Sequence, residues 1–268
     1  MITDAQLHLW PPAPPGSDYP DYAHGTAFTA DQALSMMDAG GVDRAVLVPP
    51  SWSGDDNAYC LAAVRDHPDR FTSLGRVSLE PQRTPDELAD WYGGQGVRGL
   101  RLTFARGAAA RWLAEGRADW LWPAAAAAGI PVFVYAPGQT DALAGIAAAA
   151  PKLRLVVDHL AFDIDLRDDE LDVPLDRVCA LAAYPNVAVK ATALPSYTAE
   201  SYPFAALGRR LRRVLGVFGR RRVFWGSDAT RLSVPYDQCV RFPATLDLPP
   251  EDHDWLMHRG ISEWIGWG

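Results

Sequence analysis

The sequence predicts an α/β protein built as one (β/α)8 TIM barrel over residues 1–268, and three observations lead to this fold class. The chain has 268 residues, close to the roughly 250 that such a barrel takes as one domain. Short apolar runs recur eight times along it, and a helix-like segment follows each run. No second domain, repeat array or linker is evident between them.

The eight apolar runs have the character of strands that are buried on both faces. Several of them are continuous rather than alternating, as at 45–48, 132–135 and 155–157. Such runs are typical of a parallel sheet that helices cover on both sides. The runs lie near residues 2–8, 44–48, 72–77, 97–103, 131–136, 154–159, 187–191 and 222–227.

Helix signals stand between these runs. Thr84 offers an N-cap that is followed by proline, Glu87 completes a capping box, and the glycine pair at 93–94 is expected to end this helix. Thr29 opens another helix, which the glycine pair at 40–41 closes. Further helices are expected over 141–150 and 205–218.

Alternating strands and helices also fit an open doubly wound sheet. That fold commonly carries a glycine-rich phosphate loop, yet no G-x-G-x-x-G or G-K-[ST] pattern follows any of the runs. A closed barrel is therefore the favoured architecture.

Composition limits the partners. The formal net charge is −8, which argues against nucleic acid or an anionic membrane as a partner, because either favours a basic face. No stretch reaches the roughly 20 apolar residues that cross a bilayer, and no signal-peptide pattern opens the chain. We expect a cytoplasmic protein with three free, buried cysteines (Cys60, Cys179 and Cys239). The sequence leaves its oligomeric state open, a homo-oligomer included.

Ionisable residues gather at the ends of the apolar runs. In a (β/α)8 barrel the active site lies at the carboxyl ends of the strands, so these side chains are expected to meet there. Taken singly, the histidines also fit satisfied core residues, the arginine and lysine fit buried ion pairs that brace the barrel, and the aspartate fits a helix cap. The six residues are His8, Arg101, Tyr135, His159, Lys190 and Asp228.

The motifs together resemble the amidohydrolase-2 (amidohydrolase-related) family. The resemblance runs in order from about residue 2 to Trp267 and is greatest to the lactonase-like branch, which includes sugar lactonases and 2-pyrone-4,6-dicarboxylate lactonase. It implies a barrel that hydrolyses cyclic esters. The motifs that carry it are Asp4-Ala-Gln-Leu-His8-Leu-Trp10, Asp56-Asn57, Gly99-Leu-Arg101, Asp158-His159-Leu, Asn186-Val-Ala-Val-Lys190 and Trp225-Gly-Ser-Asp228.

Two departures from the family pattern bear on a metal. The family's His-x-His at the first strand is Gln6-Leu-His8 here, and Tyr135 stands where many members place a histidine ligand. Zinc takes three or four His, Cys or carboxylate ligands, so we expect no metal and no other cofactor. A weak zinc site at His8, His159 and Asp228 is the open alternative. The resemblance to the pyrone lactonase, which has tyrosine at this strand, implies catalysis without metal.

The resulting hypothesis is metal-independent hydrolysis of a lactone. Asp228 acts as general base on water, and His8, His159 and Tyr135 donate hydrogen bonds to the oxyanion. The substrate is a small molecule, anionic or polyhydroxylated. Its expected contacts come from five residues: Arg101, Lys190, Gln6, Trp52 and Asn57.

Two other functions remain open from the sequence. One is a metal-dependent decarboxylase of an aromatic or unsaturated acid, since related family members use a metal in this way. The other is a pathway cyclase or isomerase, or a small-molecule binder, on a degenerate barrel. The loops at 11–20, 51–56 and 163–172 are expected to decide the substrate.

Overall fold

The computed structural model describes residues 1–13 and 26–268 and has the predicted barrel architecture. The proline-rich loop expected at 11–20 therefore lies mostly outside the described residues. Each predicted apolar run overlaps one strand. The strands are β1 (Thr3–Leu7), β2 (Arg44–Leu47), β3 (Phe71–Ser73), β4 (Leu100–Thr103), β5 (Val132–Tyr135), β6 (Leu155–Val157), β7 (Val187–Thr192) and β8 (Val223–Gly226).

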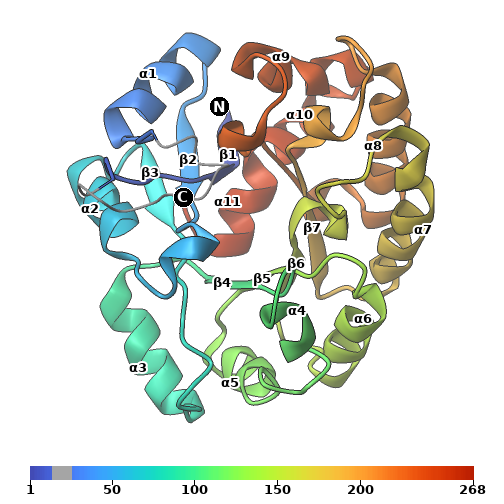
Figure 1. Ribbon diagram of the computed structural model, residues 1–268. Coiled ribbons are helices and arrows are strands. Elements are labelled where there is room, and N and C mark those ends of the chain that lie inside the picture. The colour runs from blue at the N-terminus through green and yellow to red at the C-terminus, as the bar shows by residue number, and fades with distance from the viewer. Residues whose placement is uncertain (14–25) are drawn as a thin grey trace.

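Helices surround the strands as an outer ring (Figure 1). A π-helical turn at Trp255–Arg259 joins the last two of them. In chain order the helices are α1 (Ala30–Gly40), α2 (Ala58–Asp66), α3 (Pro85–Gln95), α4 (Ala109–Trp112), α5 (Leu121–Ala128), α6 (Thr140–Ala149), α7 (Asp172–Ala180), α8 (Ala205–Phe218), α9 (Tyr236–Arg241), α10 (Pro250–Asp254) and α11 (Gly260–Ile265).

The barrel closes at two seams. The strands form parallel sheets in the orders β1-β2-β3 and β4-β5-β6-β7-β8. A parallel bridge between Gly75 and Leu100 joins β3 to β4, and the Asp228 amide donates to the Gln6 carbonyl at 2.9 Å between β8 and β1. At Gly226 a Cβ atom would stand 2.9 Å from the Gln6 amide nitrogen. Glycine is required there because the two backbones approach so closely.

The predicted helix caps are present, with one difference in length. Thr29 and Thr84 each complete a capping box, and α1 ends at the left-handed Gly41 as expected. The predicted end of α3 at the glycine pair 93–94 is wrong, because the helix continues to a left-handed C-cap at Gly96. An interior glycine costs a helix only about 1 kcal/mol, so the pair at 93–94 weakens the helix without ending it.

The amino-terminal end of the barrel is filled by apolar side chains. Phe133, Val156 and Phe224 from the strands cluster with Ile261 and Ile265 of α11. Figure 1 shows α11 lying across the centre of the ring of strands. This plug occupies one end of the barrel, so the space for a ligand lies at the opposite, carboxyl ends of the strands.

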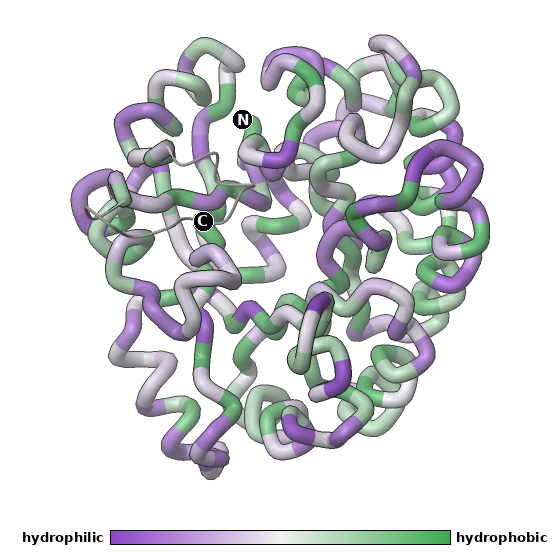
Figure 2. The backbone as a smooth tube through the Cα atoms, in the orientation of Figure 1, coloured by the Kyte–Doolittle hydropathy of each residue, from purple (hydrophilic) through white to green (hydrophobic). Residues whose placement is uncertain are grey.

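The outer helices are amphipathic, as α8 illustrates. Leu207, Leu211, Val214 and Phe218 recur at helical spacing and are buried, whereas the arginines between them face outward. The helices of the ring accordingly alternate between hydrophobic and hydrophilic stretches in Figure 2. Within residues 1–13 and 26–268, no helix is both long and apolar enough to span a membrane.

The three cysteines are free thiols, as predicted. Cys60 and Cys239 are buried, and burial raises the pKa of the Cys60 thiol to about 12. The prediction that all three are buried is wrong for Cys179, which is partly exposed on α7. Its side chain packs against the core from this helix without being fully covered.

Candidate active site at the carboxyl ends of the strands

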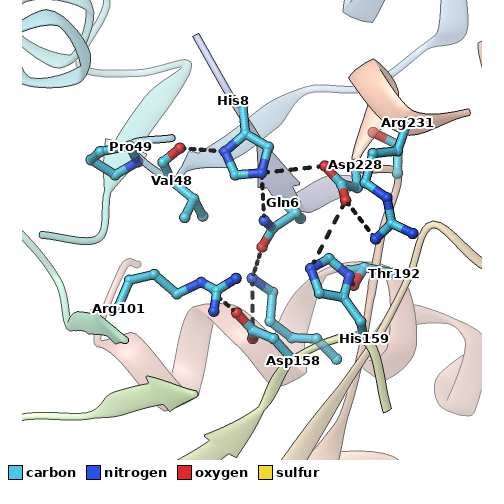
Figure 3. A network of polar contacts seen from close by, with 12 residues as sticks. Gln6, His8, Val48, Pro49, Arg101, Asp158, His159, Thr192, Asp228 and Arg231 are labelled. Atoms are coloured by element: carbon cyan, nitrogen blue, oxygen red, sulfur yellow. Dashed lines mark hydrogen bonds and ion pairs between the residues drawn. The ribbon is translucent and has the colours of Figure 1, made fainter. Parts of the chain in front are cut away.

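Three predicted residues meet at the carboxyl ends of the strands. His8 follows β1, His159 follows β6 and Asp228 follows β8. His8 Nε2 lies 3.4 Å from Asp228 Oδ1, and His159 Nε2 lies 3.9 Å from Asp228 Oδ2 (Figure 3). The carboxylate therefore stands between the two imidazoles, which reach it from strands far apart in the sequence.

The backbone at two of these residues is held in the left-handed region. His159 has φ 55° and Asp228 has φ 48°. Residues other than glycine seldom adopt this conformation, which costs of order 1–3 kcal/mol. The turns after β6 and β8 thus hold these side chains at the opening formed by the carboxyl ends of the strands, which we call the mouth. They do so although the backbone conformation is unfavourable, as is common at functional sites.

A directional chain of hydrogen bonds fixes the tautomer of His8. The Lys190 ammonium can only donate, and it donates to Gln6 Oε1. The Gln6 amide nitrogen then faces His8 Nε2 at 3.1 Å and donates to it. On the other side of the ring, His8 Nδ1 donates to the Val48 carbonyl at 2.6 Å. Neutral His8 therefore carries its proton on Nδ1 and presents a lone pair at Nε2.

Burial keeps this imidazole neutral. It lowers the pKa of His8, although the nearby Asp228 charge acts in the opposite direction. A neutral ring agrees with the hydrogen bond from Gln6, since a protonated Nε2 would oppose that donor. His8 is consequently a neutral ring whose Nε2 lone pair accepts from Gln6, beside the Asp228 carboxylate.

His159 carries its proton on the other ring nitrogen, Nε2. Its Nδ1 lies 2.7 Å from the Thr192 hydroxyl, and its Nε2 faces the Asp228 carboxylate. The favourable assignment has the hydroxyl donating to Nδ1, which leaves the proton on Nε2 toward the negative charge. Burial first, and then the positive charge of Arg231, hold the pKa of His159 well below its usual value. His159 is thus a neutral donor.

A buried ion network lies beneath the two histidines. The Asp158 carboxylate contacts Arg101 Nε at 2.9 Å and Lys190 Nζ at 3.5 Å. All three side chains are almost completely buried. Burial lowers the pKa of Lys190 to about 8, while Asp158 acts to raise it. This network braces β4, β6 and β7 and supports the chain that leads through Gln6 to His8.

The carboxylate of Asp228 is paired with a single cation among the described residues, Arg231. It is fully buried, and within the part of the chain that the structure describes neither oxygen accepts a hydrogen bond. Its neighbours are the two histidines and Arg231, whose Nη1 lies 3.5 Å from Oδ2. Both oxygens of Asp158 also accept no hydrogen bond within the described residues, but Asp228 differs because it lines the cavity, so its lone pairs are available to a bound molecule.

The mouth opens into a cavity of about 650 Å³, a size typical of small-molecule sites. His8, His159 and Asp228 line it together with two predicted substrate contacts, Arg101 and Trp52. Apolar side chains form much of the remaining wall, namely Trp10, Leu79, Leu102, Phe104 and Trp112.

Three predicted substrate contacts lie elsewhere. Gln6 and Lys190 are fully buried and are not among the residues that line the cavity. Their contacts place them in the hydrogen-bond chain behind His8. Asn57 is also outside the cavity lining, and its side-chain amide binds both the backbone amide and the carbonyl of Arg76. These residues position others rather than reach the cavity.

Tyr135 lines the cavity, but its hydroxyl donates to the Phe162 carbonyl at 3.0 Å. Its ring packs edge-on against His159, with centroids 4.9 Å apart. The hydroxyl proton of Tyr135, predicted to bind the oxyanion, is thus held by the backbone. The proton of His8 is also unavailable, because it is bound to the Val48 carbonyl. Of the three predicted oxyanion donors, His159 is the one whose proton points toward the mouth.

Several cavity residues were missed from the sequence, among them Arg76 and Arg231. Arg76 follows β3, and Arg231 lies three residues after Asp228. A signal for Arg76 existed, because an arginine interrupts the apolar run at 72–77 just as Arg101 interrupts the next one. Arg231 gave no comparable signal, since it falls in an irregular segment after β8.

The family resemblance raises the question of a divalent metal, and the donor set does not fit one. A metal needs the Nε2 lone pair of His8, which accepts the Gln6 amide proton, and the Gln6 oxygen accepts from Lys190. Arg231 adds a cation beside the Asp228 carboxylate. Among the described residues, no three His, Cys, Asp or Glu side chains form a group able to hold a metal.

Comparisons with known proteins agree with this architecture. The family model described as Amidohydrolase matches residues 3–259. A curated L-fucono-1,5-lactonase from Burkholderia ambifaria is 25% identical over 222 residues, which cover 82% of this chain and 73% of that protein.

Solved structures give the same barrel. A zinc-bound amidohydrolase from Burkholderia multivorans has a TM-score of 0.83 at 18% identity and covers 99% of both chains. A putative 2-pyrone-4,6-dicarboxylic acid hydrolase from Pseudomonas putida has a TM-score of 0.76 at 20% identity, covering 99% of this chain and 97% of the other.

Proposed function

The chain belongs to the amidohydrolase family, and from this premise we propose that it hydrolyses the ester bond of a lactone, without a metal and with Asp228 as the general base. Both the curated relative and one of the structural relatives are described as enzymes that open cyclic esters. The reaction needs a base, an acceptor-lined place for water and a donor for the carbonyl oxygen.

The observation that carries the proposal is the carboxylate of Asp228. It is fully buried, lines the cavity and accepts no hydrogen bond from the described residues. His8 Nε2, which accepts the Gln6 amide proton, lies 3.4 Å from it. A water molecule that donates a hydrogen bond to the Asp228 carboxylate from the cavity would meet the base directly.

The proposed steps use only these side chains and water. Asp228 removes a proton from the water, and the oxygen attacks the carbonyl carbon of the lactone. The negative charge that develops on the carbonyl oxygen is stabilised by the Nε2 proton of His159 and by the Arg101 guanidinium. The ring C–O bond then breaks, and the leaving oxygen takes the proton from Asp228, which yields a hydroxy acid.

The donor set described above supports a reaction without metal. Gln6 turns the imidazole that a metal would need into a neutral acceptor, and Arg231 supplies positive charge next to the base. The barrel of the zinc-bound relative shares the fold at 18% identity, so its metal is a property of that protein.

The test compares Asp228→Asn with a matched control on a lactone panel. Asp247 also has a left-handed φ, 49°, and is exposed, so Asp247→Asn changes the same chemistry outside the cavity. We expect chelator-treated wild type and Asp247→Asn to open at least one lactone equally well. Asp228→Asn should lose at least about 10²-fold in kcat. Activity that disappears on chelation and returns with zinc, or an active Asp228→Asn, would contradict the proposal.

A further inference from the structure

The cavity contains a buried arginine that forms no ion pair with any carboxylate of the described residues. Five arginines line the cavity, and four of them contact a carboxylate: Arg101 with Asp158, Arg106 with Asp165, Arg117 with Glu80 and Arg231 with Asp228. Arg76 makes no such pair within residues 1–13 and 26–268, although only 7% of it is exposed.

The neutral contacts of Arg76 leave most of its protons weakly bonded. Its Nε donates to the Pro49 carbonyl at 2.7 Å. Both terminal nitrogens reach one acceptor, the Thr103 hydroxyl, at 3.3 and 3.4 Å, which is long for an N–H···O bond. A guanidinium has five donors in a planar fork, so the outer edge of this fork is available to a ligand.

A buried asparagine holds the backbone of this arginine in place. Asn57 is buried and binds Arg76 at both backbone groups, accepting from its amide at 2.7 Å and donating to its carbonyl at 2.9 Å. Burial and the Arg101 charge lower the pKa of Arg76 more than the charges of Asp55 and Asp158 raise it, and a buried cation without a directly paired carboxylate is costly. An anion from the substrate would offset that cost.

The wall near Arg76 indicates what kind of molecule brings the anion. Trp10, Trp52, Leu79, Phe104 and Trp112 line the same cavity. Polar side chains such as Ser78, Glu80 and Thr103 also line the cavity, but the tryptophan and phenylalanine rings give it broad apolar faces that offer a sugar hydroxyl few partners. A flat apolar ring suits the aromatic walls.

We propose that Arg76 binds a carboxylate of the substrate through its guanidinium fork, and that the substrate is a lactone carrying this carboxylate on an apolar ring. The ester is held at His159 and Asp228, and the ring lies between the aromatic walls. This inference rests on the proposed lactonase function for the reaction, but the anion site itself does not depend on turnover.

The first test uses matched lactones, coumarin-3-carboxylate and coumarin, with wild type and Arg76→Met. Wild type should prefer the carboxylated compound in kcat/KM, and Arg76→Met should lose at least about 10²-fold on it. On neutral coumarin the variant should stay within about threefold of wild type. Equal losses on both compounds would assign Arg76 a structural role and overturn the proposal. Arg76→Lys, which keeps the charge but not the fork, should show an intermediate loss on the carboxylate alone.

The second test measures binding of 1-naphthoate by calorimetry, which needs no hydrolysis. Arg76→Met should weaken binding at least about 30-fold, whereas Arg106→Met, a cavity arginine that is exposed at the rim, should weaken it no more than about threefold. Naphthoate binding with no lactone turnover would leave the anion site standing and reject the lactonase function. Unchanged binding in Arg76→Met would overturn the anion site.

Discussion

Asp4 and Asp228 are both fully buried where β8 meets β1, yet their surroundings differ completely. Asp4 accepts hydrogen bonds from the amide and hydroxyl of Ser227, from the Gln6 amide and from Tyr236. Asp228 accepts none from the described residues and lines the cavity. Burial alone therefore does not identify a base, because the partners decide whether a carboxylate holds the fold together or stays available for chemistry.

The two residues are also linked. Asp4 holds the backbone and side chain of Ser227, the residue before Asp228, and so anchors the turn that carries the base. Asp158 provides the third case, a carboxylate occupied by the cations Arg101 and Lys190. Saturated, ion-paired and available carboxylates thus lie within one barrel, and substitutions can separate their roles.

The largest effect on stability is expected from Asp158→Asn. It leaves Arg101 and Lys190 buried without their counter-ion, which should lower the free energy of unfolding by about 3–5 kcal/mol. Urea unfolding measures this loss. Asp228→Asn is the contrasting variant and should change stability by less than about 1 kcal/mol, since it breaks no hydrogen bond of the described residues and its one cationic partner, Arg231, is partly exposed. A similar loss of unfolding free energy in both variants would contradict the different roles assigned to Asp158 and Asp228.

The next effect concerns pH and Asp4. Burial raises the pKa of Asp4 from 3.8 to about 6, even though its hydrogen bonds act to lower it. The folded protein therefore holds this proton more tightly than the unfolded chain, so the stability that Asp4 contributes falls as pH rises from about 4 to 6. The fall amounts to about 3 kcal/mol at most.

Urea unfolding of wild type and Asp4→Asn at several pH values between 4 and 7 checks this effect. The stability of wild type relative to the variant should decline across that interval, because asparagine does not titrate. Parallel stability curves for the two proteins would show that Asp4 does not titrate in the folded state as inferred.

The smallest effect is expected from Gln6→Met, which tests how the mouth is organised rather than which carboxylate acts. Methionine keeps the volume but removes the link from Lys190 to His8. The His8 ring then loses the donor that keeps its lone pair aligned, and kcat should fall about tenfold, or about 1.4 kcal/mol in activation free energy. Full activity in Gln6→Met would show that the hydrogen bonds from Lys190 through Gln6 to His8 do not contribute to catalysis.

The sequence predicted the barrel because its strands are buried on both faces and therefore read as continuous apolar runs. It also predicted that His8, His159 and Asp228 converge, since residues at the carboxyl ends of parallel strands meet at one end of a barrel. The caps at Thr29 and Thr84 were readable because capping is local.

The direction of the hydrogen bonds could not be read in the same way. Whether His8 donates or accepts depends on Val48 and Gln6, and whether Tyr135 has a free proton depends on Phe162, 27 residues away. Likewise, the sequence gives no means of knowing that Asn57 supports Arg76, or that Arg76 forms no ion pair with a carboxylate in the described part of the chain. Such facts depend on tertiary contacts rather than on local pattern.

The most direct test of the contrast between the two aspartates is the kcat of Asp4→Asn and Asp228→Asn on the same lactone at pH 7, with both variants shown to be folded. We predict that Asp228→Asn loses at least about 10²-fold, whereas Asp4→Asn stays within about tenfold of wild type because it acts only through the turn. Equal losses in the two variants, or a greater loss in Asp4→Asn, would contradict the assignment of Asp228 as the base.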